Sequence, residues 1–150
     1  MQRFVPRPQP YDVPYKGIYR VHQRVAKEWR RGRILLAGDA AHLNNPLGAF
    51  GLNGGLHDAI LLADYLGKVW RGEADETLVD RYVRQRRTAN VEFVQTQSIA
   101  NKRLLEEADP AAREKKFEEM RQIAADKDAA RDFLIKSSMI WSVRRAAEIV

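Results

Sequence analysis

The chain has 150 residues, of which 45% are hydrophobic and 31% are charged, and its formal net charge is +6. This length and composition are typical of one globular domain with a modest core. The sequence contains no cysteine, which excludes disulfides and thiolate metal sites. The N-terminal MQRFVPRPQP has no apolar core of a signal peptide, and no apolar run approaches the ~20 residues of a membrane-spanning helix. We therefore predict a cytoplasmic protein that does not bind a membrane.

The first third of the chain predicts an extended arm followed by two strands. Four of the six prolines lie between Met1 and Tyr15, where neither a helical nor a strand period is present. Apolar and polar residues then alternate from Ile18 to Val25, which is typical of a strand. After a charged link, the continuous apolar run Ile34–Ala37 predicts a strand buried on both faces, as in a parallel sheet covered by helices.

The remaining two thirds have helical spacing. Apolar residues recur from Leu52 to Leu66, and Gly72 is a typical helix stop. A second helix of more than 25 residues is predicted to start near Thr77, and Asp109-Pro110 marks a further helix start. We expect a mostly α-helical chain with about two strands. We divide it into an arm and strand at residues 1–32, a strand, loop and helix at 33–72, and a helical region at 73–150.

The glycine-rich loop between the second strand and the first helix has features of a cofactor site. The Asp39 carboxylate follows the strand directly, where open α/β sheets bind ligands, and is suited to accept hydrogen bonds from sugar or polyol hydroxyls. Gly48 and Gly51 remove side chains where a ligand would approach the backbone, and Pro46 stiffens the loop. The helix start at Leu52-Asn53 offers free N–H groups and a positive dipole end. A polyhydroxylated cofactor with an electron-rich ring or an anionic group fits this pattern, although such loops also occur as simple turns.

The string from Gly38 to Ala59 resembles a known flavin-binding motif. It consists of G-D-A-A-H, then Pro46, Gly48, Gly51, Asn53 and Asp58-Ala59. This pattern is similar to the second flavin-binding motif of the FAD-dependent aromatic monooxygenases, the para-hydroxybenzoate hydroxylase-like family. The resemblance covers residues 15–82 well and the later helices more loosely. It implies an α/β ancestry, with this chain as a piece of an FAD/NAD(P)-binding Rossmann-like fold.

The resemblance also implies a cofactor, a reaction and a set of binding residues. FAD would be reduced by NAD(P)H, and a C4a-hydroperoxyflavin would hydroxylate an aromatic, phenol-like substrate. Asp39 would bind a ribityl hydroxyl, Pro46 and Leu47 would lie beside the isoalloxazine ring, and the backbone at Leu52 and Asn53 would face its pyrimidine side. The implied cofactor-binding residues are Gly38, Asp39, Pro46, Leu47, Gly48, Gly51, Leu52 and Asn53. No side chain is assigned a catalytic role or a metal.

Other parts of the family pattern are absent from this sequence. It contains no G-x-G-x-x-G that would hold the ADP half of FAD and no middle Asp-Gly motif. The chain therefore resembles the C-terminal part of a monooxygenase. Three interpretations stay open: a separate N-terminal chain completes the fold, the chain is a truncated product, or copies associate through unpaired strand edges. The alternative function is a non-catalytic helical interaction module with a retained flavin motif, but no motif residue has been lost.

The remaining polar clusters have mainly structural interpretations. We predict that His42 packs or hydrogen-bonds near the loop rather than acting as a base, and that His22 and His57 show no metal spacing with it. A basic cluster on the second helix is interleaved with acidic residues and lacks aromatic stacking partners for nucleic acid. It consists of Arg81, Arg84, Arg86 and Arg87. We predict that this cluster is a solvated helix face, or a docking surface for the missing part, and not a nucleic-acid site.

Overall fold

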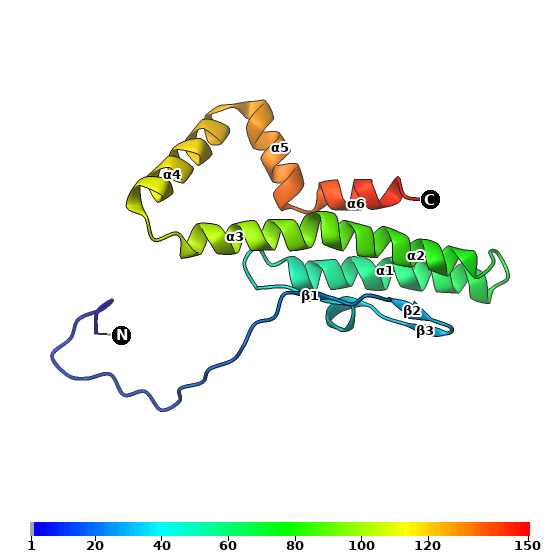
Figure 1. Cartoon of the computed structure of the whole chain (residues 1–150), viewed down its shortest axis with the longest axis horizontal. Helices are drawn as coiled ribbons and strands as arrows, with labels where there is room; N and C mark the ends of the chain where they lie inside the picture. The colour runs from blue at the N-terminus through cyan, green and yellow to red at the C-terminus, as the bar shows by residue number, and fades with distance from the viewer. Residues whose placement is uncertain (1) are drawn as a thin grey trace.

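The computed structural model describes residues 2–150 as an extended arm, two small hairpin-like pairings and a set of long helices (Figure 1). The strands are β1 (Arg24–Val25), β2 (Arg30–Arg31), β3 (Ile34–Leu35) and β4 (His42–Leu43). The helices are η1 (Gly38–Ala40), α1 (Phe50–Trp70), α2 (Thr77–Ala89), η2 (Asn90–Gln95), α3 (Thr96–Glu106), α4 (Pro110–Ala125), α5 (Lys127–Ser137) and α6 (Ile140–Ala147). A mostly helical chain with few strands is therefore confirmed. None of the helices in residues 2–150 is long and apolar enough to cross a bilayer.

The first predicted strand is much shorter than the alternating pattern indicated. Only Arg24–Val25 pairs, antiparallel to β4, with Arg24 opposite Leu43. Ile18, near the start of the pattern, is 98% exposed. A strand is stable only where a neighbour accepts and donates its backbone hydrogen bonds, and the described residues provide a neighbour for the last two positions alone. The prediction of a strand over the whole of residues 18–25 is wrong.

The second predicted strand forms, but it is not buried on both faces. Ile34–Leu35 pairs antiparallel with Arg30–Arg31 across a turn at Gly32, whose φ is +59°. Ile34 is 69% exposed. The apolar run was interpreted as part of a parallel sheet, and within residues 2–150 no parallel partner strand is present. The run is instead half covered by α1 and α2.

The predicted helices are confirmed, with one irregularity. α1 ends before Gly72, whose φ is +72°, and α2, η2 and α3 follow one another without a break over residues 77–106. The middle segment, η2, is π-helical, a wider turn that is often found at functional sites. α4 begins at Pro110, and the Asp109 carboxylate accepts hydrogen bonds from the N–H groups of the first turn, as its capping role predicts.

The helices and hairpins pack in layers that position the glycine-rich loop. α1 lies along α2, and α6 returns to cover α2 (Figure 1). The segment of the β2–β3 hairpin packs against both α1 and α2. One buried cluster joins Trp29, Ala41 and Tyr82. A second joins Phe50 at the start of α1 to three buried residues of η2 and the α5–α6 junction, which are Phe93, Val94 and Met139. Each fully buried aromatic side chain stabilises the fold by roughly 2–3 kcal/mol, so both ends of the loop are anchored in core.

Candidate functional site

The turn that carries Asp39 rests directly on helix α1. Gly38 adopts a left-handed conformation with φ +58°, and a Cβ added to Gly55 would lie 3.3 Å from the Gly38 Cα atom. Two glycines therefore allow the two backbones to touch. The Asp39 side chain is exposed, whereas the neighbouring Ala41 is buried. The turn presents a carboxylate to solvent from a tightly packed backbone.

The second half of the loop leads into α1, and no side chain caps the first turn of that helix. Gly48 has φ +105°, and a Cβ there would overlap the ring of Phe50. Ala49, the residue before the helix, is left-handed with φ +58° and provides no side-chain hydrogen bond to the first turn. Leu52 is 77% exposed, and the exposed Asn53 donates to the Ala49 carbonyl at 2.9 Å. The helix start thus keeps free N–H groups and its positive dipole end.

The loop between β4 and α1 is tied to helix α3 by a buried asparagine, which sequence reasoning missed. Asn45 Nδ2 donates to Gln23 Oε1 at 3.0 Å and to the Ser98 carbonyl at 2.9 Å. Its Oδ1 accepts from the Leu47 N–H at 3.1 Å. Asn101 Nδ2 adds a bond to the Leu47 carbonyl at 3.2 Å. The position of Pro46 and Leu47, two predicted site residues, is therefore set by side chains before and after the loop.

A fully buried carboxylate lies beneath the Gly38 turn. Asp58 Oδ2 accepts from the Gly38 N–H at 3.0 Å and lies 2.8 Å from His42 Nε2, while Oδ1 accepts from Arg86 Nε at 2.7 Å. Burial raises the pKa of the Asp58 carboxyl, but the hydrogen bond from His42, the charge and hydrogen bond of Arg86, and the Gly38 N–H outweigh it and hold that pKa below its ordinary value. The buried group is therefore an ion whose hydrogen bonds come from three different elements.

The predicted role of His42 is confirmed. The ring is buried and stacks on Trp29, with centroids 5.6 Å apart and planes inclined by 23°. Since Asp58 Oδ2 is an ionised acceptor, we assign the hydrogen to Nε2 of His42. Its Nδ1 atom is buried without a hydrogen-bond partner among the described residues. The imidazole is part of the support of the loop.

One member of the basic cluster is misassigned by the sequence interpretation. The sequence predicts a solvated or docking face for Arg86, yet the residue is 3% exposed and bonds to both Asp58 and the Gly54 carbonyl. The signal for burial was present: Arg86 follows Tyr82 by four residues and precedes Phe93 by seven, on the same face of the helix. A charged residue on an apolar stripe indicates a buried partner of opposite charge.

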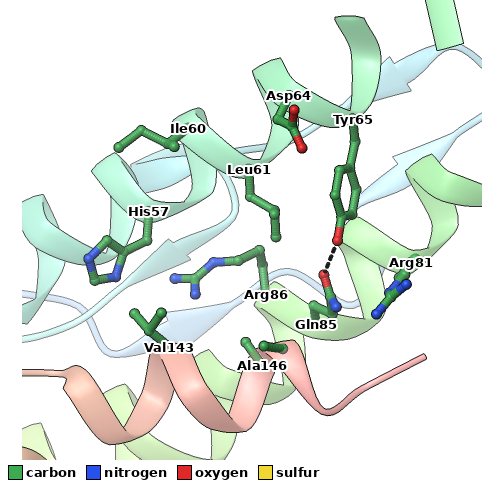
Figure 2. Close-up of a pocket in the computed structure, with 11 residues that line it drawn as sticks. His57, Ile60, Leu61, Asp64, Tyr65, Arg81, Gln85, Arg86, Val143 and Ala146 are labelled. Atoms are coloured by element: carbon green, nitrogen blue, oxygen red, sulfur yellow. Dashed lines mark hydrogen bonds between the residues drawn. The ribbon is translucent and has the colours of Figure 1, made fainter. Parts of the chain in front are cut away.

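A separate cavity of about 420 Å³ lies between α1, α2 and α6 (Figure 2). Its polar groups are mostly engaged within the chain: Tyr65 donates to Gln85 at 3.0 Å, and both Gln85 and Arg81 donate to the Ile149 carbonyl. Burial, followed by the charge of Arg86, lowers the pKa of His57 at its edge. The cavity is largely apolar, and no predicted site residue lines it.

The loop's donors and acceptors fit a flavin cofactor. An exposed carboxylate at Asp39 accepts hydrogen bonds from hydroxyls, and the uncapped first turn of α1 donates to an electron-rich ring. Asn44 Oδ1 is buried without a hydrogen-bond partner and would lie 3.2 Å from a Cβ on Gly51, so the site is too close-packed there for a side chain. The predicted site residues lie on the η1 turn, on the loop between β4 and α1 and on the first turn of α1. Asp58, His42 and Arg86 support the η1 turn from beneath.

Sequence comparison finds relatives of this chain among known monooxygenases. The sequence is 42% identical over 130 residues to para-nitrophenol 4-monooxygenase from Pseudomonas sp. (strain WBC-3), covering 87% of this chain and 32% of the relative. It is 36% identical over 134 residues to 6-hydroxy-3-succinoylpyridine 3-monooxygenase HspB from Pseudomonas putida (strain DSM 28022 / S16), covering 89% of this chain and 34% of that one. The chain thus spans about a third of the length of these curated relatives.

The fold comparison agrees with the sequence comparison. The crystal structure of p-nitrophenol 4-monooxygenase PnpA from Pseudomonas putida DLL-E4 superposes with a TM-score of 0.74 at 41% identity, over 79% of this chain and 31% of that one. The family described as FAD binding domain matches residues 4–97, more than half of the chain. This match includes the Gly38 turn, the glycine loop, helix α1 and the buried Asp58–Arg86 pair. The chain therefore belongs to the FAD binding domain family.

Proposed function

We propose that this chain forms the flavin-proximal portion of an FAD-dependent, NAD(P)H-using monooxygenase that hydroxylates an aromatic substrate. The observation that carries the proposal is the exposed Asp39 carboxylate on a turn that packs against Gly55 of α1, a helix whose first turn has no side-chain cap. The similar proteins named above are monooxygenases, one of them of para-nitrophenol. When bound, FAD would supply the electron transfer from NAD(P)H to oxygen. The residues of this chain bind it, orient it and exclude water.

The proposed roles follow the chemistry of each position. Asp39 accepts hydrogen bonds from ribityl hydroxyls, and the backbone at Leu52 and Asn53 faces the pyrimidine side of the ring. The positive end of the α1 dipole favours the negative charge of the reduced flavin there, by about 0.3–1 kcal/mol at an exposed site. Pro46 and Leu47 lie beside the ring. The proposed cofactor-binding residues are Gly38, Asp39, Pro46, Leu47, Gly48, Gly51, Leu52 and Asn53.

The proposed activity requires more polypeptide than this chain provides. We infer that a part able to hold the ADP half of FAD, or a second copy of the chain, covers the apolar residues that are exposed on α1 and β3. These include Ile34, Leu52, Ile60 and Trp70, which are 69%, 77%, 69% and 91% exposed. Burying such residues is favourable by about 25 cal/mol per Å² of apolar area. The aromatic substrate would then bind beside Pro46 and Leu47.

An FAD titration tests the proposal. Flavin fluorescence is followed as purified chain is added, with wild type, Asp39→Ala and Asp64→Ala in parallel. Asp64→Ala is the matched control, because it removes the same charge from an exposed position on α1 whose ion pair within residues 2–150 is with Lys68, at 2.8 Å. Saturable binding that is lost in Asp39→Ala and kept in Asp64→Ala supports the site. Equal binding in all three proteins contradicts the assignment of Asp39.

A second measurement separates the enzyme from the interaction module. The oxidation of NADPH and NADH by the FAD-loaded protein is followed with and without simple phenols. Substrate-dependent oxidation with formation of a hydroxylated product supports the monooxygenase. FAD binding without any such oxidation, in samples that light scattering shows to be associated, favours the non-catalytic alternative.

A further inference from the structure

We propose that Asp58, paired with Arg86, is a positioning residue that holds the Gly38–Asp39 turn and thereby sets where the Asp39 carboxylate meets FAD. The inference rests on the proposed function in one respect, that Asp39 contacts the cofactor. The Asp58 side chain is fully buried. It acts through the backbone of Gly38, whose N–H group is 3.0 Å from Asp58 Oδ2.

The turn packs closely against α1 and β4, but among the described residues it makes few hydrogen bonds. Its internal bond runs from the Ala41 N–H to the Gly38 carbonyl at 2.8 Å and closes the turn on itself. Among residues 2–150, the Gly38 N–H has one hydrogen-bond partner, Asp58 Oδ2. Gly38 and Gly55 meet without side chains, so this close contact contains no directional polar group. The carboxylate therefore provides the directional contact.

Arg86 keeps that carboxylate ionised and in place. Its Nε donates to Asp58 Oδ1 at 2.7 Å, and a second guanidinium nitrogen lies 3.3 Å from the Gly54 carbonyl on the same helix. An ionised carboxylate accepts several hydrogen bonds at once, so Oδ2 remains available for Gly38 and His42 while Oδ1 binds Arg86. The ion pair thus links α2, α1 and the loop, through one buried group.

A purely structural role would look different. Arg86 and Asp58 would still join α1 to α2 if the Gly38 N–H bonded elsewhere, and removing the pair would then alter stability without altering FAD affinity. Replacing both members of a buried ion pair by apolar residues of similar volume is often neutral or stabilising, whereas removing one partner is strongly destabilising. The double variant therefore separates the two roles.

The test compares wild type with Asp58→Leu/Arg86→Met, and with Asp58→Asn/Arg86→Met as a milder variant that keeps one carbonyl acceptor. We expect both to unfold thermally within about 5 °C of wild type. In Asp58→Leu/Arg86→Met we expect the Gly38 amide to exchange its hydrogen at least about tenfold faster than in wild type. We expect the FAD dissociation constant of this variant to rise by about tenfold or more, as for a lost hydrogen bond to a charged group. Tyr82→Phe, which loses the buried bond to the Leu36 carbonyl, is the stability control and should keep the exchange rate of Gly38.

Each outcome of the exchange and FAD-binding measurements supports or overturns the positioning role of Asp58. A folded Leu/Met variant with unchanged Gly38 exchange overturns the positioning role, and so does a wild-type Gly38 amide that exchanges as fast as the exposed arm. Faster exchange with unchanged FAD affinity shows that the turn is held but that its position does not set binding, which also overturns the proposal. If wild type binds no FAD while Gly38 exchange responds as expected, Asp58 holds the turn, and what fails is the proposal that the turn sets FAD binding in the isolated chain.

Discussion

At the scale of single residues, Gly48 is the position where the loop tolerates least change. Its φ of +105° is outside the range of L-residues, and a Cβ would overlap Phe50 and lie 2.8 Å from Asn101 Nδ2. We predict that Gly48→Ala lowers the free energy of unfolding by about 3 kcal/mol, from strain and overpacking combined. Urea unfolding followed by circular dichroism measures this loss.

The control for Gly48 is Gly32→Ala. Gly32 is also left-handed, with φ +59°, but nothing lies within 4 Å of an added Cβ. Its replacement should cost only the conformational strain, about 1 kcal/mol. Equal losses in the two variants would show that the packing of Gly48 against Phe50 and Asn101 does not matter.

The buried Asp58 predicts a loss of stability in acid. Its pKa in the folded chain lies below the ordinary value of 3.8, so the folded state binds fewer protons than the unfolded state. The stabilisation is fully present above about pH 5 and is lost as the pH falls through the folded pKa. Urea midpoints between pH 6 and pH 3 should fall steeply for wild type and less steeply for Asp58→Leu/Arg86→Met. Identical slopes would contradict the prediction.

His57 predicts a separate step at higher pH. Burial and Arg86 lower its pKa below the ordinary value of 6.5, so protonation again favours the unfolded chain. Its contribution is present above pH 6.5 and is lost as the pH falls toward the folded pKa. We expect His57→Gln to flatten the stability profile just below pH 6.5 and to leave the steeper acid limb unchanged. If His57→Gln also flattened the acid limb, the assignment of that limb to Asp58 would be wrong.

At the scale of elements, the link between the glycine loop and α3 depends on one amide. Asn45 Nδ2 donates to two oxygens, of Gln23 and Ser98. We predict that Asn45→Asp lowers the free energy of unfolding by about 2–3 kcal/mol, because a buried carboxylate oxygen would then face two acceptors. The control is Asn53→Asp at the start of α1, which should change stability by no more than about 0.5 kcal/mol. A neutral Asn45→Asp would mean that the loop is held by packing alone.

At the scale of the whole molecule, the exposed face of α1 predicts association. Leu52, Leu56 and Ile60 follow at four-residue intervals on one side of the helix and are 77%, 50% and 69% exposed. We expect light scattering to show a mass that rises with concentration, and Leu56→Glu/Ile60→Glu to reduce that rise. Phe117→Glu on α4, where the side chain is 43% exposed, is the control. If the protein is monomeric at every concentration, a second copy does not cover this face, and a different polypeptide remains the proposed partner.

The sequence alone determined the helices and the place of the loop. Helical spacing, Gly72 and the Asp109 cap are local features, so α1, the rod from Thr77 to Glu106 and the start of α4 could be predicted from nearby residues. The flavin motif was equally readable, because its glycines and Asp39 lie within one short segment. Local hydrogen bonds and backbone preferences act over a few residues, and the pattern of the sequence records them directly.

Only the tertiary structure decided what the strands and the buried charges do. The pattern at Ile18–Val25 could not specify whether a partner strand exists, and the apolar run at Ile34 was equally compatible with a buried or a half-exposed strand. Arg86 and Asp58 are separated by 28 residues in the chain, yet they meet at 2.7 Å beneath the Gly38 turn. Whether a charge is solvated or buried depends on which distant residue faces it, and that is fixed by how the helices pack.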